Sequence, residues 1–409
     1  MKQLNIVIAG LGNVGSALVD SINKNKNIFI DKSSIQININ GVSAKNRNKK
    51  RTADINNYHW CDNPLDLINL KNTNVLVELI GQEKGISFEL TKLALEKKLN
   101  VVTGNKAMIA NHGNELFEIA EKNKVLLLYE AAVAGGIPVI KTIKNILFLN
   151  NIKKISGILN GTTNYILTKM QEENLTFQEV LKIAKDKGYT SDHEADLDIG
   201  GFDSAHKLTI LSSICFGCKL NFSNNYINGI SKIKIEDINY AKKLNCKIKL
   251  VSEAYVVNNK ISCVTSPKLI ENSNPLSNVN GVLNAISIET DHIDNLFLEG
   301  PGAGGKPTAS SVISDLYEIA SSSTISSLGY KTENLIDYDK LESQNNESPY
   351  YLRIMTEDIP GVLSKITKIF TDFNISVKKI LQIPETSKPE NPKLTGCPPI
   401  TPLLGTLTM

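Results

Sequence analysis

The stretch "LNIVIAGLGNVGSALVDSI", residues 4–22, decides the fold class of the chain. It predicts a buried strand at Leu4–Ala9, a glycine turn, and a helix from about Val14. The turn matches G-x-G-x-x-G between a strand and a helix, where glycines permit a tight turn and let a pyrophosphate approach the helix N-terminus. The stretch therefore predicts dinucleotide binding. The residues expected beside the cofactor are Gly10, Gly12, Asn13, Val14 and Gly15.

Strands and helices continue to alternate as far as about residue 137. The expected strands are 74–81, 100–106 and 125–131, and the expected helices are 87–98 and 113–123. This order predicts an α/β domain with a doubly wound parallel sheet, in which ligands lie at the carboxyl ends of the strands. Lys106 and Glu130 stand at two of these ends, so both are candidates for the nucleotide crevice.

The second strand, "IQININGVSAKN" (35–46), lacks the acidic residue that would bind the ribose hydroxyls of NAD. Basic residues follow instead, among them Lys45 and Arg47, and these suit a 2′-phosphate. We therefore expect NADP(H) to be preferred, with NAD(H) possible and with Arg47 as a cofactor ligand. The alternative is a solvated surface loop.

From about Pro138 the pattern becomes α+β, which predicts a second domain. It contains "DIGGFDSAHKLTILSSICF" (198–216), where Asp203 and Lys207 are four residues apart on an otherwise apolar helix. A helix that is apolar nearly all round is buried. A buried lysine becomes a tunable acid or base, whereas a partly exposed pair is only a structural salt bridge.

A glycine-rich stretch, "GPGAGGKPTASS" (300–311), imitates a phosphate-binding loop of nucleotide hydrolases. Pro307 stands where that loop needs a serine or threonine, and proline has neither the hydroxyl for Mg²⁺ nor an N–H for phosphate. Nucleotide hydrolysis is therefore not expected. The glycines are expected to let the backbone approach a ligand or another segment closely.

Composition excludes several classes of protein. The 409 residues carry a net charge of +3, with no basic stripe for nucleic acid. No apolar run is long enough to span a membrane, and the N-terminus does not read as a signal peptide. A cytoplasmic protein is expected.

Taken in order, the motifs resemble the homoserine dehydrogenase family. They are "GLGNVG", "TGNKAMIA", "YEAAVAGGIP", "ISGILNGTTNYIL", "AKDKGY", "DLDIGGFDSAHKL" and "GPGAGGKPTASSV", and they run from residue 1 to about 330. The resemblance implies reversible, NAD(P)-dependent interconversion of L-homoserine and L-aspartate 4-semialdehyde in threonine, methionine and isoleucine biosynthesis. It also implies a homodimer or homotetramer.

The resemblance assigns roles to individual residues. Lys207 matches the proton-donating lysine, Asp203 an aspartate that binds homoserine, and Lys106 a second active-site lysine near cofactor and substrate. Gly188 and Gly302 match glycines whose backbone lines the nicotinamide and substrate site. Glu130, Val133, Gly135 and Ile137 match a sodium site that is built mainly from main-chain oxygens and shapes the loop.

One stretch departs from the family pattern. "GYTSDHEADLD" (188–198) has an extra residue and lacks the usual Asp-Pro. Counting back from Lys207 places the homoserine-binding glutamate at Asp192, and counting forward from Gly188 places it at Ser191. Asp192 is taken as the substrate ligand, and Glu194 could compensate for its shorter side chain.

The C-terminal part reads as strand, turn, helix and strand, and "DIPGVLSKI" (358–366) resembles the start of an ACT domain, a module that binds amino acids. The proline-rich end that follows suits neither a helix nor a sheet, so only half a module is expected, with weak or no inhibition by threonine. The expected divisions are 1–137 (nucleotide), 138–300 (substrate and dimerisation), 301–335 (return to the nucleotide domain), 336–348 (linker), 349–383 (partial ACT-like) and 384–409 (irregular tail).

Two other function classes are compatible with these motifs. One is a dehydrogenase of another amino acid or semialdehyde, which turnover of a substrate panel would identify. The other is a non-catalytic amino-acid sensor, against which the retained Lys106, Asp203 and Lys207 argue, because a sensor needs no proton donor.

Overall fold

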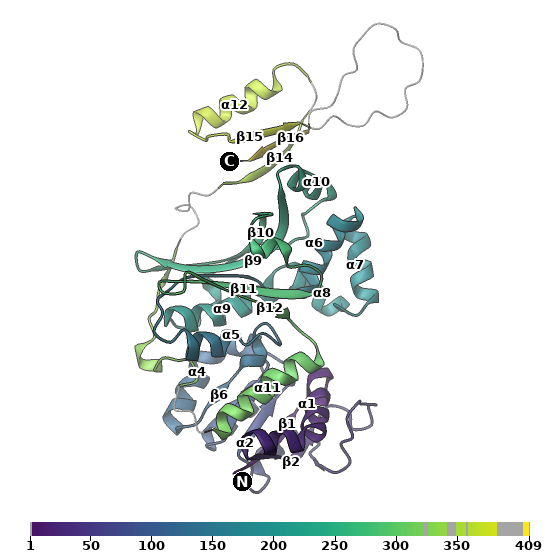
Figure 1. The fold of residues 1–409 in the computed structure, drawn as a ribbon, viewed down its shortest axis with the longest axis vertical. Coiled ribbons are helices and arrows are strands. Elements are labelled where there is room, and N and C mark those ends of the chain that lie inside the picture. The colour runs from purple at the N-terminus through teal and green to yellow at the C-terminus, as the bar shows by residue number, and fades with distance from the viewer. Residues whose placement is uncertain (1, 322–325, 342–348, 357–358, 383–403, 409) are drawn as a thin grey trace.

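The computed structural model describes residues 2–321, 326–341, 349–356, 359–382 and 404–408. A nucleotide domain, a second domain and a C-terminal module follow one another along the long axis of the molecule (Figure 1). Across the described part of the chain, no helix is both long and apolar enough to cross a membrane.

The nucleotide domain is built on a six-stranded parallel sheet with the order β3-β2-β1-β4-β5-β6. This is the strand order of doubly wound dinucleotide-binding folds, so the predicted fold class is confirmed. The strands are β1 Lys2–Ala9, β2 Ile35–Ser43, β3 His59–Trp60, β4 Val75–Glu78, β5 Asn100–Thr103 and β6 Leu127–Leu128. The helices are α1 Asn13–Lys24, α2 Lys26–Ser33, α3 Ile86–Glu96 and α4 Lys106–Asn123.

Helix α4 begins seven residues before the predicted start at Gly113. The side chain of Asn105 accepts a hydrogen bond from the Met108 N–H, and this cap starts the helix directly after β5. Gly113 lies inside the helix, and a glycine is needed there because a Cβ would come within 2.5 Å of the Leu220 side chain. The glycine therefore marks close packing between domains rather than a helix start.

The second domain carries a seven-stranded mixed sheet with the order β12-β11-β7-β9-β10-β13, and β8 also pairs with β10. Its strands are β7 Ile152–Ile158, β8 Asn225–Ile227, β9 Cys246–Val257, β10 Lys260–Glu271, β11 Leu283–Thr290, β12 Asn295–Pro301 and β13 Asp339–Lys340. Its helices are α5 Val139–Lys141, which continues as a π-helix over Thr142–Ile146, α6 Gly161–Glu173, α7 Phe177–Asp186, α8 Asp192–Ile199, α9 Phe202–Phe216 and α10 Ile235–Lys243.

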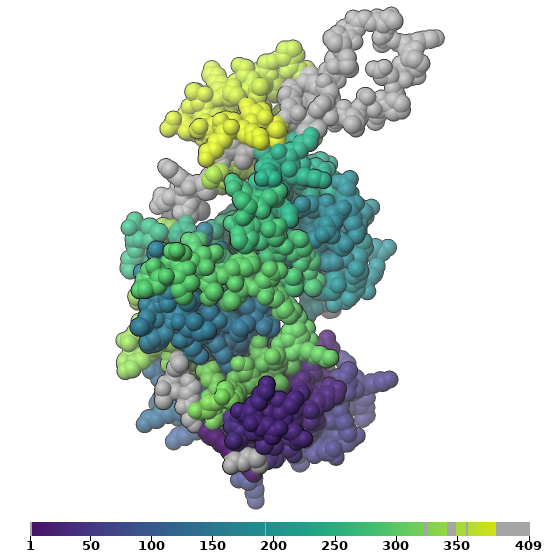
Figure 2. Space-filling view, in the orientation of Figure 1, coloured from purple at the N-terminus to yellow at the C-terminus, as the bar shows by residue number. Residues whose placement is uncertain are grey.

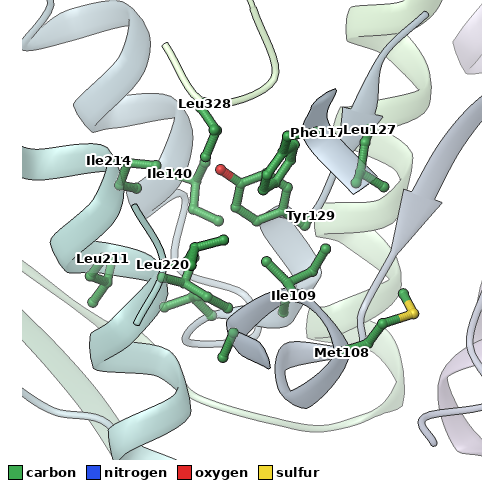
Figure 3. Close-up of a cluster of buried hydrophobic side chains, with 14 of the residues drawn as sticks. Met108, Ile109, Phe117, Leu127, Tyr129, Ile140, Leu211, Ile214, Leu220 and Leu328 are labelled. Atoms are coloured by element: carbon green, nitrogen blue, oxygen red, sulfur yellow. The ribbon is translucent and has the colours of Figure 1, made fainter. Parts of the chain in front are cut away.

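Helix α9 joins the two domains through one continuous core. It packs on β7, β9 and β10 and also against α4 of the nucleotide domain. Figure 3 shows Leu211 and Ile214 of α9 in the same cluster as Met108, Phe117 and Tyr129. Twelve of its fifteen residues are buried, which confirms the prediction of a buried helix.

The chain crosses between the domains a second time after β12. Helix α11 (Gly305–Ala320) lies beside α1, and Figures 1 and 2 show this green segment continuing onto the purple N-terminal residues. A Cβ at Gly135 would come within 2.5 Å of the Gly302 carbonyl oxygen, and Gly135 has φ +54°. The glycines of the loop before α11 thus permit close backbone contact, as the sequence predicted.

The C-terminal module is a three-stranded antiparallel sheet with one helix. The strands, in the order β14-β16-β15, are β14 Tyr351–Met355, β15 Lys379–Gln382 and β16 Leu404–Thr408, and the helix is α12 Val362–Asp372. The prediction that residues 384–409 are irregular is wrong for β16, which pairs with both other strands. That pairing is between segments distant in the sequence, and local proline content does not reveal it. The rest of that predicted tail, apart from β16, lies outside the described residues.

The module lies beside α10 (Figure 1), and Asp237 of that helix makes the contact. The Asp237 carboxylate accepts hydrogen bonds from the Tyr351 hydroxyl (2.8 Å) and the Arg353 Nε (2.7 Å). It also accepts the Lys234 N–H at the start of α10 (2.8 Å), and the aspartate is 5% exposed. One buried carboxylate therefore both caps α10 and holds β14.

We predict that Arg353→Ala loosens the N-terminus of α10. A hydrogen bond to a charged partner contributes about 1.5–3 kcal/mol, so amide exchange of residues 234–243 should accelerate about tenfold or more. Hydrogen exchange followed by mass spectrometry measures this, with Lys368→Ala, an exposed change on α12, as the control. Equal exchange in both variants would show that the contact does not stabilise α10.

Candidate active site

The glycine turn after β1 is shaped for a nucleotide. A Cβ at Gly10 (φ +102°) would lie 2.4 Å from the Leu79 backbone, and one at Gly15 would lie 2.0 Å from the Gly10 carbonyl oxygen. Next to Gly12, in contrast, nothing lies within 4 Å. Two glycines thus close the turn and pack the helix, and the middle one leaves space at the N-terminus of α1, where Asn13 and Val14 begin the helix.

Lys106 is held at the carboxyl end of the sheet by a buried network. The Glu78 carboxylate, 0% exposed, accepts the N–H groups of Ile80 and Gly81 and the hydroxyl of Thr103 (2.6 Å). The Thr103 hydroxyl in turn accepts the Asn105 N–H, and Asn105 caps α4. Lys106 is the first residue of α4, so this network fixes its position, with its side chain directed away from the nucleotide domain.

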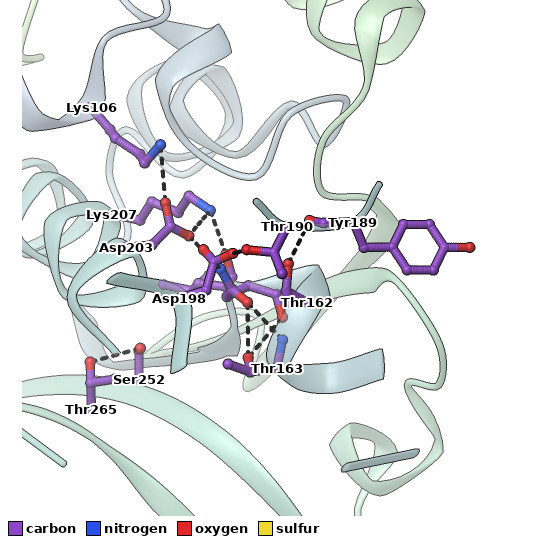
Figure 4. A network of polar contacts seen from close by, with 12 residues as sticks. Lys106, Thr162, Thr163, Tyr189, Thr190, Asp198, Asp203, Lys207, Ser252 and Thr265 are labelled. Atoms are coloured by element: carbon purple, nitrogen blue, oxygen red, sulfur yellow. Dashed lines mark hydrogen bonds and ion pairs between the residues drawn. The ribbon is translucent and has the colours of Figure 1, made fainter. Parts of the chain in front are cut away.

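The Asp203 carboxylate receives lysines from both domains (Figure 4). Its Oδ2 lies 2.7 Å from the Lys207 Nζ, and its Oδ1 lies 3.0 Å from the Lys106 Nζ. Lys207 also donates to the Leu159 carbonyl at the end of β7 (2.6 Å). Asp203 and Lys207 are buried, each 8% exposed, whereas the Lys106 side chain is 39% exposed. Asp203 lies in the first turn of α9, where the helix dipole favours a negative charge.

Charges at this site shift two ionisation equilibria in opposite directions. Burial alone would raise the pKa of Asp203, but the ammonium groups of Lys106 and Lys207 hold that pKa far below its usual range. The charge of Asp203 raises the pKa of Lys106 against the opposing effect of burial, and Asp198 and Glu194 contribute in the same direction. Both partners are therefore charged at neutral pH.

Asn160 and Asp198 complete the cluster, although no sequence motif assigned a role to either residue. The Asn160 side-chain amide donates to Asp203 (2.9 Å) and to Asp198 (2.7 Å), and its oxygen accepts the Thr163 N–H as the cap of α6. The Thr190 hydroxyl donates to Asp198 (2.9 Å). Burial, followed by the charge of Asp203, raises the pKa of Asp198. An asparagine before a helix is a capping signal, but the carboxylates that it would meet cannot be read from spacing.

The other residues assigned from the sequence lie around this cluster or behind it. Asp192, at the start of α8, pairs with Lys185 (2.7 Å) and its side chain is 86% exposed. Gly188 (φ +72°) follows α7, and the next residue, Tyr189, accepts the Thr162 hydroxyl with its carbonyl oxygen. Gly302 faces the Asn284 side chain at the domain crossing.

The residues assigned to sodium form a buried loop. Glu130 is 1% exposed and its carboxylate accepts the N–H groups of Ile140 and Lys141, both at 2.9 Å, while Val133 and Ile137 are also buried. The Gly135 carbonyl oxygen accepts the Ser311 hydroxyl (2.6 Å). No cluster of three or more His, Cys, Asp or Glu side chains suited to a metal occurs among the described residues.

A doubly wound nucleotide domain that presents a lysine to a buried lysine–aspartate pair defines a dinucleotide-dependent oxidoreductase. Models of the homoserine dehydrogenase family match residues 138–317 and, for its NAD-binding domain, residues 10–130, and a model of the ACT domain matches residues 350–393. The chain belongs to the homoserine dehydrogenase family.

Individual relatives agree with this assignment. The chain is 38% identical to the homoserine dehydrogenase of Pseudomonas aeruginosa and 37% identical to that of Neisseria gonorrhoeae, in each case over 93% of this chain and 88% of the relative. A crystal structure of a homoserine dehydrogenase from Thiobacillus denitrificans superposes with a TM-score of 0.90 at 33% identity, covering 100% of this chain and 92% of that one. A hyperthermophilic archaeal homoserine dehydrogenase mutant in complex with NADPH gives a TM-score of 0.66 at 29% identity, over 77% and 97% of the two chains.

We predict that Asn160→Ala destabilises the fold by about 2 kcal/mol, because the buried Asp203 carboxylate and the half-buried Asp198 carboxylate each lose one of their donors. The pKa of Asp198, which is already raised in the folded state, will rise further when this donor is removed. A carboxyl group with a raised folded-state pKa lowers the stability of the fold as the pH increases through that pKa. The loss should therefore be larger at pH 8 than at pH 5. Urea unfolding at both pH values measures it, with Asn239→Ala on the exposed face of α10 as the control. A loss independent of pH would contradict the electrostatic role.

Proposed function

We propose that the homoserine dehydrogenase reaction, the reversible interconversion of L-homoserine and L-aspartate 4-semialdehyde, takes place at the Asp203 cluster. The observation that carries this proposal is the shared carboxylate, which brings Lys207 of the second domain and Lys106 of the nucleotide domain to one point. The carboxyl ends of β4 and β5, where the fold binds nucleotides, face the same place.

The charge balance of the cluster supports an amino-acid substrate. The carboxylates of Asp203, Asp198 and Glu194 all act on Lys106, whereas two lysines, Lys106 and Lys207, contact the Asp203 carboxylate. The excess negative charge favours the ammonium group of homoserine. Burial and the charge of Asp203 raise the pKa of Asp198, and a cation beside Asp198 would counteract both effects.

Proton transfer falls to the lysines. An ammonium group has three donors, and Lys207 directs one to Leu159 and one to Asp203, so a third remains for the oxygen of the substrate. When semialdehyde is reduced, that N–H stabilises the negative charge that develops on the aldehyde oxygen and then supplies its proton. When homoserine is oxidised, the neutral amine takes up the hydroxyl proton. The bound nicotinamide supplies or accepts the hydride.

The loop after β2 supports NADP(H) as the preferred cofactor. Lys45 and Arg47 are exposed there, and a cavity of about 440 Å³ lies between this loop and Trp60. The Arg47 guanidinium lies 5.7 Å from the centre of the Trp60 ring. The cavity lining contains Arg47, Lys49 and Arg51 against one carboxylate, that of Asp54, and no acidic residue stands at the end of β2, so the charge there favours a 2′-phosphate.

A sodium ion at the loop 130–137 is proposed from main-chain oxygens alone. Ala134 (φ +55°) and Gly135 (φ +54°) are successive left-handed residues, so the loop is tightly curled between the two domain crossings. The Gly135 oxygen already accepts from Ser311, but a carbonyl oxygen has a second lone pair for a cation. Thermal unfolding in sodium and in potassium chloride tests this site.

A second copy of the chain is proposed to cover the outer face of the second sheet. Residues such as Ile155 and Ala254 point to α9, so Ser156 and Glu253 point to the opposite face. A groove of about 190 Å³ lies on that face, and Glu253 there pairs with Lys154 and Lys268. Sedimentation velocity tests whether the protein is a homodimer or homotetramer.

We predict that Lys207→Ala lowers kcat by about 10²-fold or more in both directions while NADPH still binds, because the proton donor is lost and the nucleotide site is kept. Lys106→Ala should lower kcat/KM for both cofactor and substrate, since Lys106 lies at the domain junction. Lys182→Ala, an exposed change on α7, serves as the control. Near-normal kcat in Lys207→Ala would transfer the proton-donating role to Lys106.

A second prediction decides which acid replaces the family glutamate. Glu194 is among the charges that act on Lys106, whereas Asp192 pairs with Lys185, so Glu194→Gln should raise the KM for homoserine about tenfold. Asp192→Asn should change it less than about twofold, as expected for an exposed ion pair. The reverse order of effects would restore Asp192 as the substrate ligand.

A further inference from the structure

Arg51 occupies an unusual position in the loop after β2. Its Nη1 donates to the carbonyl oxygens of Arg47 and Lys49, both at 2.9 Å, and its Nη2 donates to that of Asn46 (2.5 Å). Its Nε donates to the Leu11 carbonyl oxygen (3.3 Å), which belongs to the glycine turn after β1. Four of its five N–H donors therefore bind main-chain oxygens of this chain.

These contacts distinguish Arg51 from the other basic residues of the loop. Lys45, Arg47 and Lys49 are exposed, whereas Arg51 is half-buried. A guanidinium binds a phosphate through two parallel N–H groups, and Arg51 has one donor left. Arg51 is therefore poorly placed as a phosphate ligand, although its charge and its place in the sequence suggest one.

The same contacts tie together the two parts of the nucleotide site. The loop 46–51 closes around the guanidinium, and the bond to Leu11 fixes that loop against the turn that receives the pyrophosphate. Trp60 supports the arrangement, since its ring centre lies 5.8 Å from Arg51 and 5.7 Å from Arg47. Arg47 and Arg51 both line the cavity, but four of the five N–H donors of Arg51 are engaged by main-chain oxygens, so Arg51 holds Arg47 in place and has little left to offer a phosphate.

We propose that Arg51 is a positioning residue for cofactor choice, which organises the loop so that Arg47 and Lys45 meet the 2′-phosphate. This inference rests on the proposed preference for NADP(H). Lysine at this position would keep the charge and lose the planar fork that satisfies four carbonyls at once. The loop would then lose its fixed distance from the glycine turn, and the 2′-phosphate would lose its ligands.

The test compares 2′,5′-ADP with 5′-AMP, which differ only in the 2′-phosphate, by calorimetry on the full chain. Arg51→Lys should weaken the binding of 2′,5′-ADP about tenfold and that of 5′-AMP less than about threefold, and Arg47→Ala should show the same selectivity. At saturating NADPH the kcat of Arg51→Lys should stay within about twofold of the parent chain. Lys32→Ala, an exposed change on α2 that removes one positive charge as Arg47→Ala does, is the control and should alter neither affinity.

Three outcomes would overturn the inference. If Arg51→Lys binds both probes like the parent chain while Arg51→Ala binds 2′,5′-ADP weakly, charge alone matters and Arg51 is a phosphate ligand. If Arg51→Lys weakens both probes equally, the residue only supports the turn. A parent chain that binds the two probes equally well would overturn the proposed cofactor preference as well, which separates the two failures.

Discussion

The carboxylate of Asp203 is shared by ammonium groups that come from different domains. Lys207 reaches it from the same helix and Lys106 from the start of α4, while Asn160 donates to it from α6. A buried charge that loses one partner is costly, about 3–5 kcal/mol, so each of these elements is constrained by the others. The Asp203 interaction therefore couples the geometry of the site to the arrangement of the two domains, which also share one apolar core.

Elements of both domains hold the Asp203 cluster in place. In the nucleotide domain, buried Glu78 fixes the ends of β4 and β5 and, through Thr103 and Asn105, the start of α4. In the second domain, α9 lies on β7, β9 and β10, and its apolar residues continue the core that contains Phe117 and Tyr129. The lysine–aspartate cluster is thus a polar centre held by rigid elements, as the proposed proton transfer at a fixed distance would require.

Local patterns predicted the fold well where the signal was local. The glycine turn, the alternating elements and the buried α9 followed from apolar periodicity and from glycine placement. The predicted start of α4 was wrong because Gly113 is a glycine for close packing against Leu220, a residue distant in the sequence. β16 was missed for the same reason, since its partners lie far along the chain.

The candidate site was predictable in part. Asp203 and Lys207 share a helical face, and Lys106 follows a strand of the predicted sheet, so spacing and context could indicate them. Asn160, Thr190 and Asp198 join the cluster only through folding of three separate segments. Arg51 is the opposite case: its sequence position suggests a phosphate ligand, and only its carbonyl contacts show that its donors are engaged elsewhere.

The most direct measurement is NADPH oxidation with L-aspartate 4-semialdehyde by the parent chain and by Asp203→Asn, with folding of both verified by circular dichroism. If the shared carboxylate organises the site, the parent chain turns over and Asp203→Asn loses about 10²-fold or more in kcat/KM, because both lysines lose their common partner. A folded Asp203→Asn variant with kcat/KM close to that of the parent chain would contradict the account.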